Sequence, residues 1–351
     1  MPDVAGDPAA GERHGGGPHH PLSAAEAAAD GPAASLAFLD MTTDDRPQDD
    51  VARRPGRLGV GVVGAGRVGA VLGSALRAAG HAVVGVSAVS RASLDRAEAM
   101  LPGVPVLEVP DVVERAELVL LTVPDDALPG LVEGLSTTGA WQTGQLVVHT
   151  SGRYGWRVLD PAVLRGAIPL ALHPAMTFTG TSLDLVRLAD CCFGISAPGP
   201  VLPIAQALVV EMGAEPVLVA EEARPLYHAA LAHGANHLVT LVAQALDVLR
   251  AAGVDHPDRV LAPLLSAALD NALRSGDAAL TGPVARGDAG TVDAHLAAVG
   301  AVDPAVADTY RALARATADR ALAAGRLSPA AAEALLAALA QPPGPPGGAT
   351  P

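Results

Sequence analysis

Hydrophobic residues follow two different patterns along this chain of 351 residues. From about residue 58, short runs rich in valine, isoleucine and leucine alternate with longer segments rich in alanine and leucine. The short runs have the length and composition of buried strands, whereas the longer segments have helical spacing. We predict strands at 58–63, 82–87, 104–107, 117–123, 144–150, 168–172, 192–196 and 215–219.

The segment between the first two predicted strands, residues 67–79, is predicted to be a helix, with Gly80 just past its C-terminus. Strands that alternate with helices form parallel sheets, because each right-handed crossover returns the chain in the same direction. We therefore predict an α/β fold in which residues 57–220 form a doubly wound parallel sheet.

The strand pattern stops after about residue 221. Residues 223–252 are apolar on most faces, which predicts a long buried helix, and several shorter helices follow to about 340. Residues 221–340 are thus predicted to be an all-α domain for substrate binding or dimerisation. The flanking segments 1–56 and 341–351 lack an apolar period and are predicted to be disordered tails.

A glycine-rich motif joins the first strand to the first helix: Gly64, Ala65, Gly66, Arg67, Val68 and Gly69. The first glycine permits a tight turn, the second lets the backbone approach a pyrophosphate, and the third lets the helix pack closely on the strand. The start of the helix then directs its amides at the anion. In this strand–loop–helix context the motif predicts a dinucleotide site, although a glycine-rich turn that binds nothing is the alternative.

The end of the second strand favours NADP(H) over NAD. An NAD site usually carries an acidic residue there, which accepts hydrogen bonds from the ribose 2′-hydroxyl. This chain instead has Ser90 and Arg91, followed by Ser93. A guanidinium and hydroxyls can bind a 2′-phosphate, which a carboxylate would repel. The alternative for Arg91 is a solvated residue at the start of a helix.

Other residues at the carboxyl ends of the strands are expected to line the cofactor site, since ligands bind at this edge of open α/β sheets. They are Thr122, Val123, Pro124 and Ser151. For the first three, an ordinary strand terminus is the alternative, because proline is common at such ends.

Composition excludes several other functions. The formal net charge of −14 argues against nucleic acid as a partner. No apolar run approaches the length of a membrane span, and no signal-peptide pattern is present, so we expect a cytoplasmic protein without a membrane partner. All 23 basic residues are arginine. Mechanisms that use a lysine ammonium are therefore closed to this chain.

Reduction by a nicotinamide requires a group that polarises the substrate and supplies a proton. Our catalytic candidates are His173, His228 and Asn236; the last two share a broad helix face with Ala232 at i, i+4, i+8. The alternative is that neighbouring backbone groups satisfy each side chain. His233 and His237 are also four apart, but no third ligand has suitable spacing, so no metal site is predicted.

Thr281 and Arg286 are candidates for substrate binding, because an arginine fork suits a small-molecule carboxylate. The alternative is that Arg286 forms a local ion pair with Asp288.

Six segments in this order resemble one known family: GVVGAGRVG, VSR, HTSG, LHPAMTF, YHAALAHGANHL and ALTGPVARGD. They resemble the Rossmann-like oxidoreductases that carry the domain of unknown function 2520 (DUF2520), and the resemblance covers about residues 58–335. It implies an architecture similar to that of pyrroline-5-carboxylate reductases, ketopantoate reductases and 3-hydroxyacid dehydrogenases. In these proteins a Rossmann domain precedes a helical domain, like that of 6-phosphogluconate dehydrogenase, which often forms a homodimer.

Some members of this group are an alternative type of ketopantoate reductase, so the resemblance implies NADPH-dependent reduction of a small 2-oxo acid, 2-dehydropantoate. One departure concerns a lysine that ordinary ketopantoate reductases place about one turn before an asparagine. Asn236 matches the asparagine, but Ala232 stands where the lysine would be. The proton must then come from His228, His173 or water. An imine reductase of the pyrroline-5-carboxylate type and a non-catalytic NADP-binding sensor or scaffold are the alternatives.

Overall fold

The computed structural model describes residues 57–340. The two predicted tails, 1–56 and 341–351, lie outside the described residues. Within the described part of the chain, no helix combines the length and apolar character that a membrane span requires.

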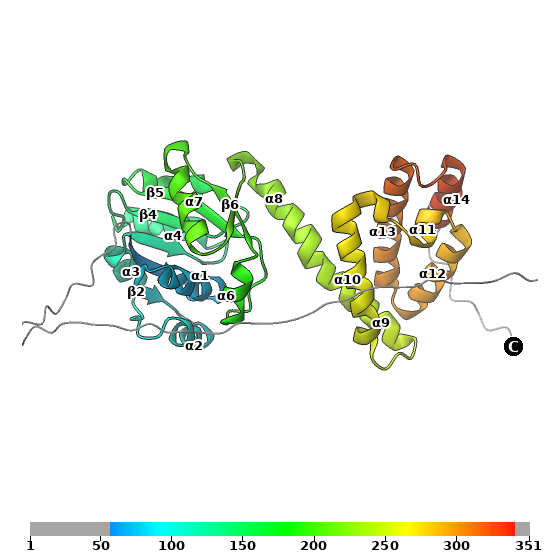
Figure 1. The fold of residues 1–351 in the computed structure, drawn as a ribbon, viewed down its shortest axis with the longest axis horizontal. Coiled ribbons are helices and arrows are strands. Elements are labelled where there is room, and N and C mark those ends of the chain that lie inside the picture. Colours follow the sequence, from blue (N-terminus) through cyan, green and yellow to red (C-terminus); the bar gives the residue numbers. More distant parts are fainter. Residues whose placement is uncertain (1–56, 341–351) are drawn as a thin grey trace, which may run out of the picture. The chain divides into compact units, whose positions relative to one another are not determined.

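Seven strands form one sheet in the order β2-β1-β3-β4-β5-β6-β7 (Figure 1). Their bounds are β1 Gly59–Val63, β2 Ala82–Ser87, β3 Leu118–Leu121, β4 Leu146–His149, β5 Ile168–Pro174, β6 Cys192–Ser196 and β7 Glu215–Leu218. β1 to β5 are mutually parallel, as predicted, but β6 is antiparallel to β5, and β7 is parallel to β6. The predicted doubly wound sheet is confirmed and is mostly parallel; the antiparallel direction of β6 was not foreseen, because an apolar run does not encode strand direction.

The predicted strand at 104–107 is also absent as a strand. Only Val106 pairs with β2, through an isolated bridge to Val86. Pro102 and Pro105 both precede this residue and lack the N–H groups that a longer ladder would need. By contrast, the first predicted helix is confirmed as α1, Arg67–Ala78, and Gly80 follows it with φ of 99°.

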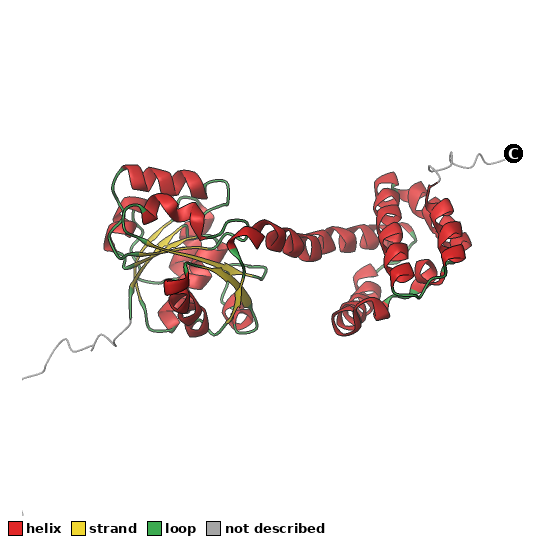
Figure 2. Cartoon of the chain, turned by 90° about the horizontal axis from the view of Figure 1, so that it is seen from above, coloured by secondary structure: helices red, strands yellow, loops and turns green. Residues whose placement is uncertain are grey.

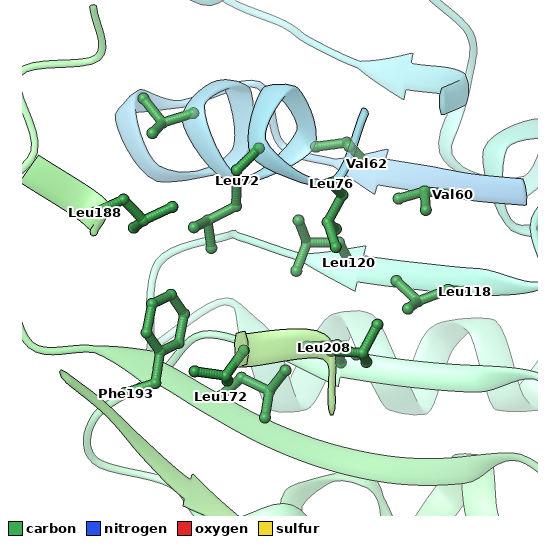
Figure 3. Close-up of a cluster of buried hydrophobic side chains, with 14 of the residues drawn as sticks. Val60, Val62, Leu72, Leu76, Leu118, Leu120, Leu172, Leu188, Phe193 and Leu208 are labelled. Carbon is green, nitrogen blue, oxygen red and sulfur yellow. The ribbon is translucent and has the colours of Figure 1, made fainter. Parts of the chain in front are cut away.

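Helices cover both faces of the sheet (Figure 2). They are α1, α2 Arg91–Met100, α3 Val109–Arg115, α4 Leu128–Thr137, α5 Asp160–Val163, α6 Leu183–Leu188 and α7 Leu202–Glu211. Alternate residues of each strand enter two separate cores: Leu118 and Leu120 of β3 face α1 and α7, whereas Val119 and Leu121 face α3 and α4. Figure 3 shows the first core, where Leu72 and Leu76 of α1 lie over β1 and β3.

The chain continues into helices α8 Arg224–Leu231, α9 His237–Ala251, α10 Pro257–Ser275, α11 Gly282–Arg286, α12 Ala289–Val302, α13 Pro304–Ala323 and α14 Pro329–Ala340. A π-helical turn, Ala232–Asn236, joins α8 to α9. Buried residues of α11 to α14 form their own core, which includes Val292, Ala318 and Leu335. The predicted helix at 223–252 is present, but the prediction that it is buried is wrong for the chain by itself, since α9 contains no buried residue.

The glycine-rich loop generates a stability prediction. A Cβ on Gly69 would overlap the Gly64 carbonyl oxygen and Thr122 Oγ1, whereas a Cβ on Gly66 would meet no atom within 4 Å. Gly69→Ala is therefore expected to lower the free energy of unfolding by about 1–3 kcal/mol, as overpacking does. Urea denaturation of the full chain measures this.

Two control variants make the comparison specific. Gly134 in α4 also has open space around its Cβ position, so Gly134→Ala should leave stability unchanged or raise it by up to about 1 kcal/mol. Gly66→Ala should stay near wild type as well. Equal losses in Gly69→Ala and Gly66→Ala would contradict the packing assignment.

Candidate active site

The glycine-rich loop is fixed by hydrogen bonds from both neighbouring strands. The backbone N–H groups of Gly64 and Ala65 donate to Ser87 at the end of β2, at 3.1 and 2.9 Å. Thr122 Oγ1, just past β3, donates to the carbonyl of Gly64 at 2.5 Å. Because the loop is held before any ligand arrives, its amides at the start of α1 are preorganised for an anion. Thr122 thus fixes the glycine-rich loop, and Val123 and Pro124 follow it at the same edge of the sheet. The contact of these three residues with the cofactor stays a prediction.

The residues predicted to select NADP(H) begin α2, close to the glycine-rich loop. Ser90 is the N-cap of this helix and accepts the N–H of Ser93 at 3.2 Å. Arg91 is largely exposed, and its Nε lies 2.9 Å from Asp95. A 2′-phosphate would therefore compete with Asp95 for the guanidinium of Arg91. The Arg91–Asp95 ion pair is exposed, so Asp95 binds the guanidinium only weakly.

A fully buried histidine orders the loop that follows β4. The Nε2 atom of His149 lies 2.9 Å from the carbonyl oxygen of Gly155, and its Nδ1 accepts the N–H of Ser151 at 3.2 Å. Burial lowers the pKa of His149 to about 3, so the ring is neutral and we assign its hydrogen to Nε2. The hydroxyl of Ser151 in turn accepts the N–H of Tyr154 at 3.2 Å. Ser151, predicted to contact the cofactor, therefore also shapes this loop.

The structure brings together two of the three predicted catalytic residues. The rings of His173 on β5 and His228 on α8 are 6.0 Å apart between centroids. Both approach Gly152, where an added Cβ would lie 2.8 Å from His173 Nε2 and from His228 Cδ2. Gly152 lies three residues after the end of β4, so the two histidines lie at the carboxyl edge of the parallel strands, where ligands bind in such folds.

Sequence reasoning missed the partner of His173. Tyr227 lies one residue before His228 on α8, and its hydroxyl is 3.0 Å from His173 Nδ1. Burial raises the pKa of this hydroxyl, although Arg224 opposes the shift, so the phenol keeps its proton at neutral pH. Tyr227 stands next to His228 in the sequence, but no local pattern indicates that it contacts His173, 54 positions earlier.

Arg224 sets the charge of this cluster. Its side chain is fully buried, and it donates to the carbonyl oxygens of Ala171 and Gly194 and to Ser196 Oγ. Burial, together with the charges of Arg224 and His228, lowers the pKa of His173 to about 4. His173 is therefore neutral at pH 7. We assign Tyr227 as donor to Nδ1, which leaves the Nε2 hydrogen of His173 directed at Gly152.

Asn236, the third catalytic candidate, is exposed at the end of the π-helical turn. A π-helical turn contains one residue more than an α-helical turn. Two turns of an α-helix span about seven residues, whereas the two turns from His228 to Asn236 span eight. The π turn therefore keeps the two side chains on one helix face. His233 and His237 contact each other, with 3.2 Å between their Nδ1 atoms. Among residues 57–340, no group of three or more His, Cys, Asp or Glu could hold a metal ion.

The two predicted substrate-binding residues meet in the C-terminal helices. Thr281 and Arg286 line an open hollow of about 550 Å³ together with Arg326, which the sequence did not single out. Asp288 does not pair with Arg286 as the alternative required; it caps α12 by accepting the N–H of Thr291 at 3.0 Å. The guanidinium of Arg286 is therefore available to an anion.

Comparison with known proteins agrees with this architecture. A family model for a Rossmann-like domain matches residues 43–174, and the model for a domain of unknown function, DUF2520, matches residues 191–317. No curated protein sequence matches the chain.

Solved structures with the same fold include three bacterial proteins. A Bacteroides fragilis protein assigned as an NADP oxidoreductase is 22% identical, with a TM-score of 0.63 over 75% of this chain and 98% of its own. The imine reductase of Myxococcus stipitatus in complex with NADP⁺ is 20% identical, with a TM-score of 0.57 over 74% and 94%. A Thermotoga maritima protein is 21% identical, with a TM-score of 0.55 over 74% and 98%.

At this level of identity the likenesses to solved structures show a shared fold. The two domain matches follow each other along the chain and agree with the motifs that predicted them. The chain is therefore similar to a Rossmann-like domain in its first part and to DUF2520 in its second.

Proposed function

We propose that this protein is an NADP(H)-dependent oxidoreductase that reduces a C=O or C=N bond of a small carboxylate. The observation that carries the proposal is the pair of Tyr227 and His173, held at the carboxyl edge of the sheet beside Gly152. Solved structures of the same fold include an imine reductase in complex with NADP⁺, which supports the cofactor class.

The residues at the glycine-rich loop fit a dinucleotide. The backbone at Gly66 has open space where a Cβ would stand, so a pyrophosphate can approach it closely. The end of β2 carries Ser90 and Arg91 in place of a carboxylate, which suits a 2′-phosphate. NADPH, when bound, supplies the hydride that adds to the substrate carbon.

The histidine and tyrosine can supply the proton that must accompany the hydride. His173 donates its Nε2 hydrogen to the oxygen or nitrogen of the reduced bond, and Tyr227 donates its hydroxyl hydrogen to Nδ1. The ring stays neutral throughout, and the negative charge moves to the phenolate. Arg224 stabilises that charge, since its Cζ lies 5.8 Å from the ring centre of Tyr227. The phenolate then regains a proton from solvent.

The substrate contacts follow from the same proposal. His228 and Asn236, on one face of the α8–α9 helix, orient the reacting bond by hydrogen bonding. Arg286 and Thr281, which line a hollow in the C-terminal helices, are the candidates for binding the carboxylate of the substrate. Our specific candidate for the substrate is 2-dehydropantoate, and the protein is expected to work in the cytoplasm.

A cyclic imine of the pyrroline-5-carboxylate type is the second candidate substrate. Two observations favour it: the fold is shared with an imine reductase, and Ala232 replaces the lysine of ordinary ketopantoate reductases. An imine is more basic than a ketone, so its reduction depends less on a strong general acid.

We also propose that the protein forms a homodimer through α9 and α10. Large apolar side chains on both helices are exposed in the single chain: Leu238, Val239 and Leu241 of α9, and Val260, Leu264, Leu269 and Leu273 of α10. Large exposed apolar side chains on neighbouring helices favour an association site. A second copy is the proposed partner because equivalent surfaces pair across a twofold axis.

The substrate proposal predicts that purified protein oxidises NADPH when it is given 2-dehydropantoate or a cyclic imine carboxylate. Absorbance of NADPH across a panel of both substrate classes measures the rate and separates the two candidates. Asn236→Ala should abolish turnover while NADPH still binds. If the protein binds NADPH tightly but turns over neither class, and Asn236→Ala and His228→Ala leave binding unchanged, a sensor or scaffold replaces the proposed enzyme.

The proton relay predicts that Tyr227→Phe lowers kcat by about ten- to a hundredfold, because general acid catalysis contributes at least this much. KM should change little, since Tyr227 acts through His173 and does not touch the substrate. Stopped-flow and steady-state kinetics give both quantities, and NMR titration of His173 reports the lost hydrogen bond.

A matched control for this variant exists in the C-terminal helices. Tyr310 contacts His295 Nδ1 at 2.9 Å, also with perpendicular rings. Tyr310→Phe removes an equivalent hydroxyl and should leave kcat unchanged. Equal kcat values for Tyr227→Phe and the wild type would refute the relay.

The dimer proposal predicts that sedimentation equilibrium at micromolar concentration gives twice the mass of a single chain. Val239→Glu combined with Leu264→Glu should shift the protein to the monomer, because two charges would be buried in the contact. Leu164→Glu is the control, since Leu164 is 87% exposed but lies in the sheet region. A wild-type monomer at these concentrations contradicts the proposal.

A further inference from the structure

The segment between β5 and α6 reaches across to the glycine-rich loop and α2. Gly180 in this segment is buried, and its φ is +81°. A Cβ on Gly180 would lie 2.7 Å from Arg96 Cδ and Nε and 3.1 Å from Arg67 Cγ. Two arginine side chains, one from α1 and one from α2, therefore converge on this glycine.

A buried carboxylate fixes the position of Gly180. Asp184 has no exposed surface, and its Oδ2 accepts the backbone N–H groups of Thr179 and Gly180, each at 2.7 Å. The hydroxyl of Thr179 donates to Oδ1 of the same carboxylate at 3.0 Å. The segment is thus a rigid support, and any side chain at position 180 would displace the arginines above it.

Arg96 lies between this support and the glycine-rich loop. Its Nη1 donates to the carbonyl oxygen of Ala65 at 3.4 Å. Arg67 is the first residue of α1, at the helix end where a pyrophosphate binds. Within residues 57–340, neither guanidinium forms a salt bridge, whereas Arg91 is paired with Asp95.

The two side chains approach the same glycine from α1 and α2, and a guanidinium without a carboxylate partner can bind an anion. We propose that Arg67 and Arg96, supported by Gly180, form a clamp on the pyrophosphate of the dinucleotide. This inference rests on the proposed cofactor. It divides the arginines by role: Arg67 and Arg96 bind the phosphates that NADH and NADPH share, and Arg91 binds the 2′-phosphate that only NADPH carries.

The assignment to the pyrophosphate follows from position. Arg96 contacts Ala65, which directly precedes Gly66, the glycine whose backbone approaches the pyrophosphate. Arg91 stands at the start of α2, directly after the end of β2, where the ribose 2′ position is bound. The two arginines are on different faces of α2, because they are five residues apart.

Calorimetric titration of the full chain with NADPH and with NADH tests the clamp without requiring turnover. Arg96→Gln should raise the Kd of both nucleotides by a similar factor, about ten- to a hundredfold, as expected for a lost charged hydrogen bond. Arg91→Gln should raise the Kd of NADPH and leave that of NADH nearly unchanged. Arg77→Gln, at the far end of α1, is the control and should change neither.

Gly180→Ala provides a second test, since it displaces Arg96 without removing a charge. Gly180→Ala should raise the Kd of both nucleotides, as Arg96→Gln does. The far-ultraviolet circular dichroism of the variant should match that of the wild type, which shows that the variant is folded. Loss of NADPH binding alone in Arg96→Gln overturns the pyrophosphate assignment, and unchanged Kd values overturn the clamp while the proposed function stands. Absence of binding by the wild type would instead refute the proposed cofactor, and the clamp with it.

Discussion

One buried guanidinium connects the sheet to the helices that follow it. Arg224 begins α8 and donates to main-chain carbonyl oxygens of β5 and β6, so the first turn of that helix is tied to the sheet. Unpaired buried charges are costly, and here polar oxygens around the guanidinium offset part of that cost. The same positive charge adds to the effect of burial, which keeps His173 neutral, and it lies against Tyr227. Arg224 therefore both anchors α8 and contributes to the protonation state of the site.

Because the chain has no lysine, one residue type cannot both bind anions and donate protons, as the lysine of other reductases can. In the proposed relay the donors are His173 and Tyr227 at the sheet edge, which exchange protons without becoming cations. The cations of the chain are all arginines, which are never deprotonated in proteins and therefore bind anions but do not supply protons. The arginines accordingly gather where phosphates and carboxylates are expected: Arg67 and Arg96 at the glycine-rich loop, and Arg286 and Arg326 at the hollow in the C-terminal helices.

Local features were predictable from the sequence. The glycine-rich loop, the helix that starts at Arg67 and the seven strands of the sheet all follow from short-range patterns, because turn geometry and alternation act between near neighbours. The direction of β6 was not predictable, since an apolar strand pairs equally well either way. The burial expected for residues 237–251 was also wrong, because periodicity says that a face is apolar but does not say what covers it.

Sequence patterns were enough to locate the strands, the phosphate-binding loop and the candidates His173 and His228. The contacts that these residues make depend on how separate elements pack together. The tertiary structure joined Tyr227 to His173, used His149 to order the loop after β4, and brought Arg96 over Gly180. Each of these contacts depends on side chains from different elements, and a local pattern of polar and apolar residues carries no information about which elements will meet.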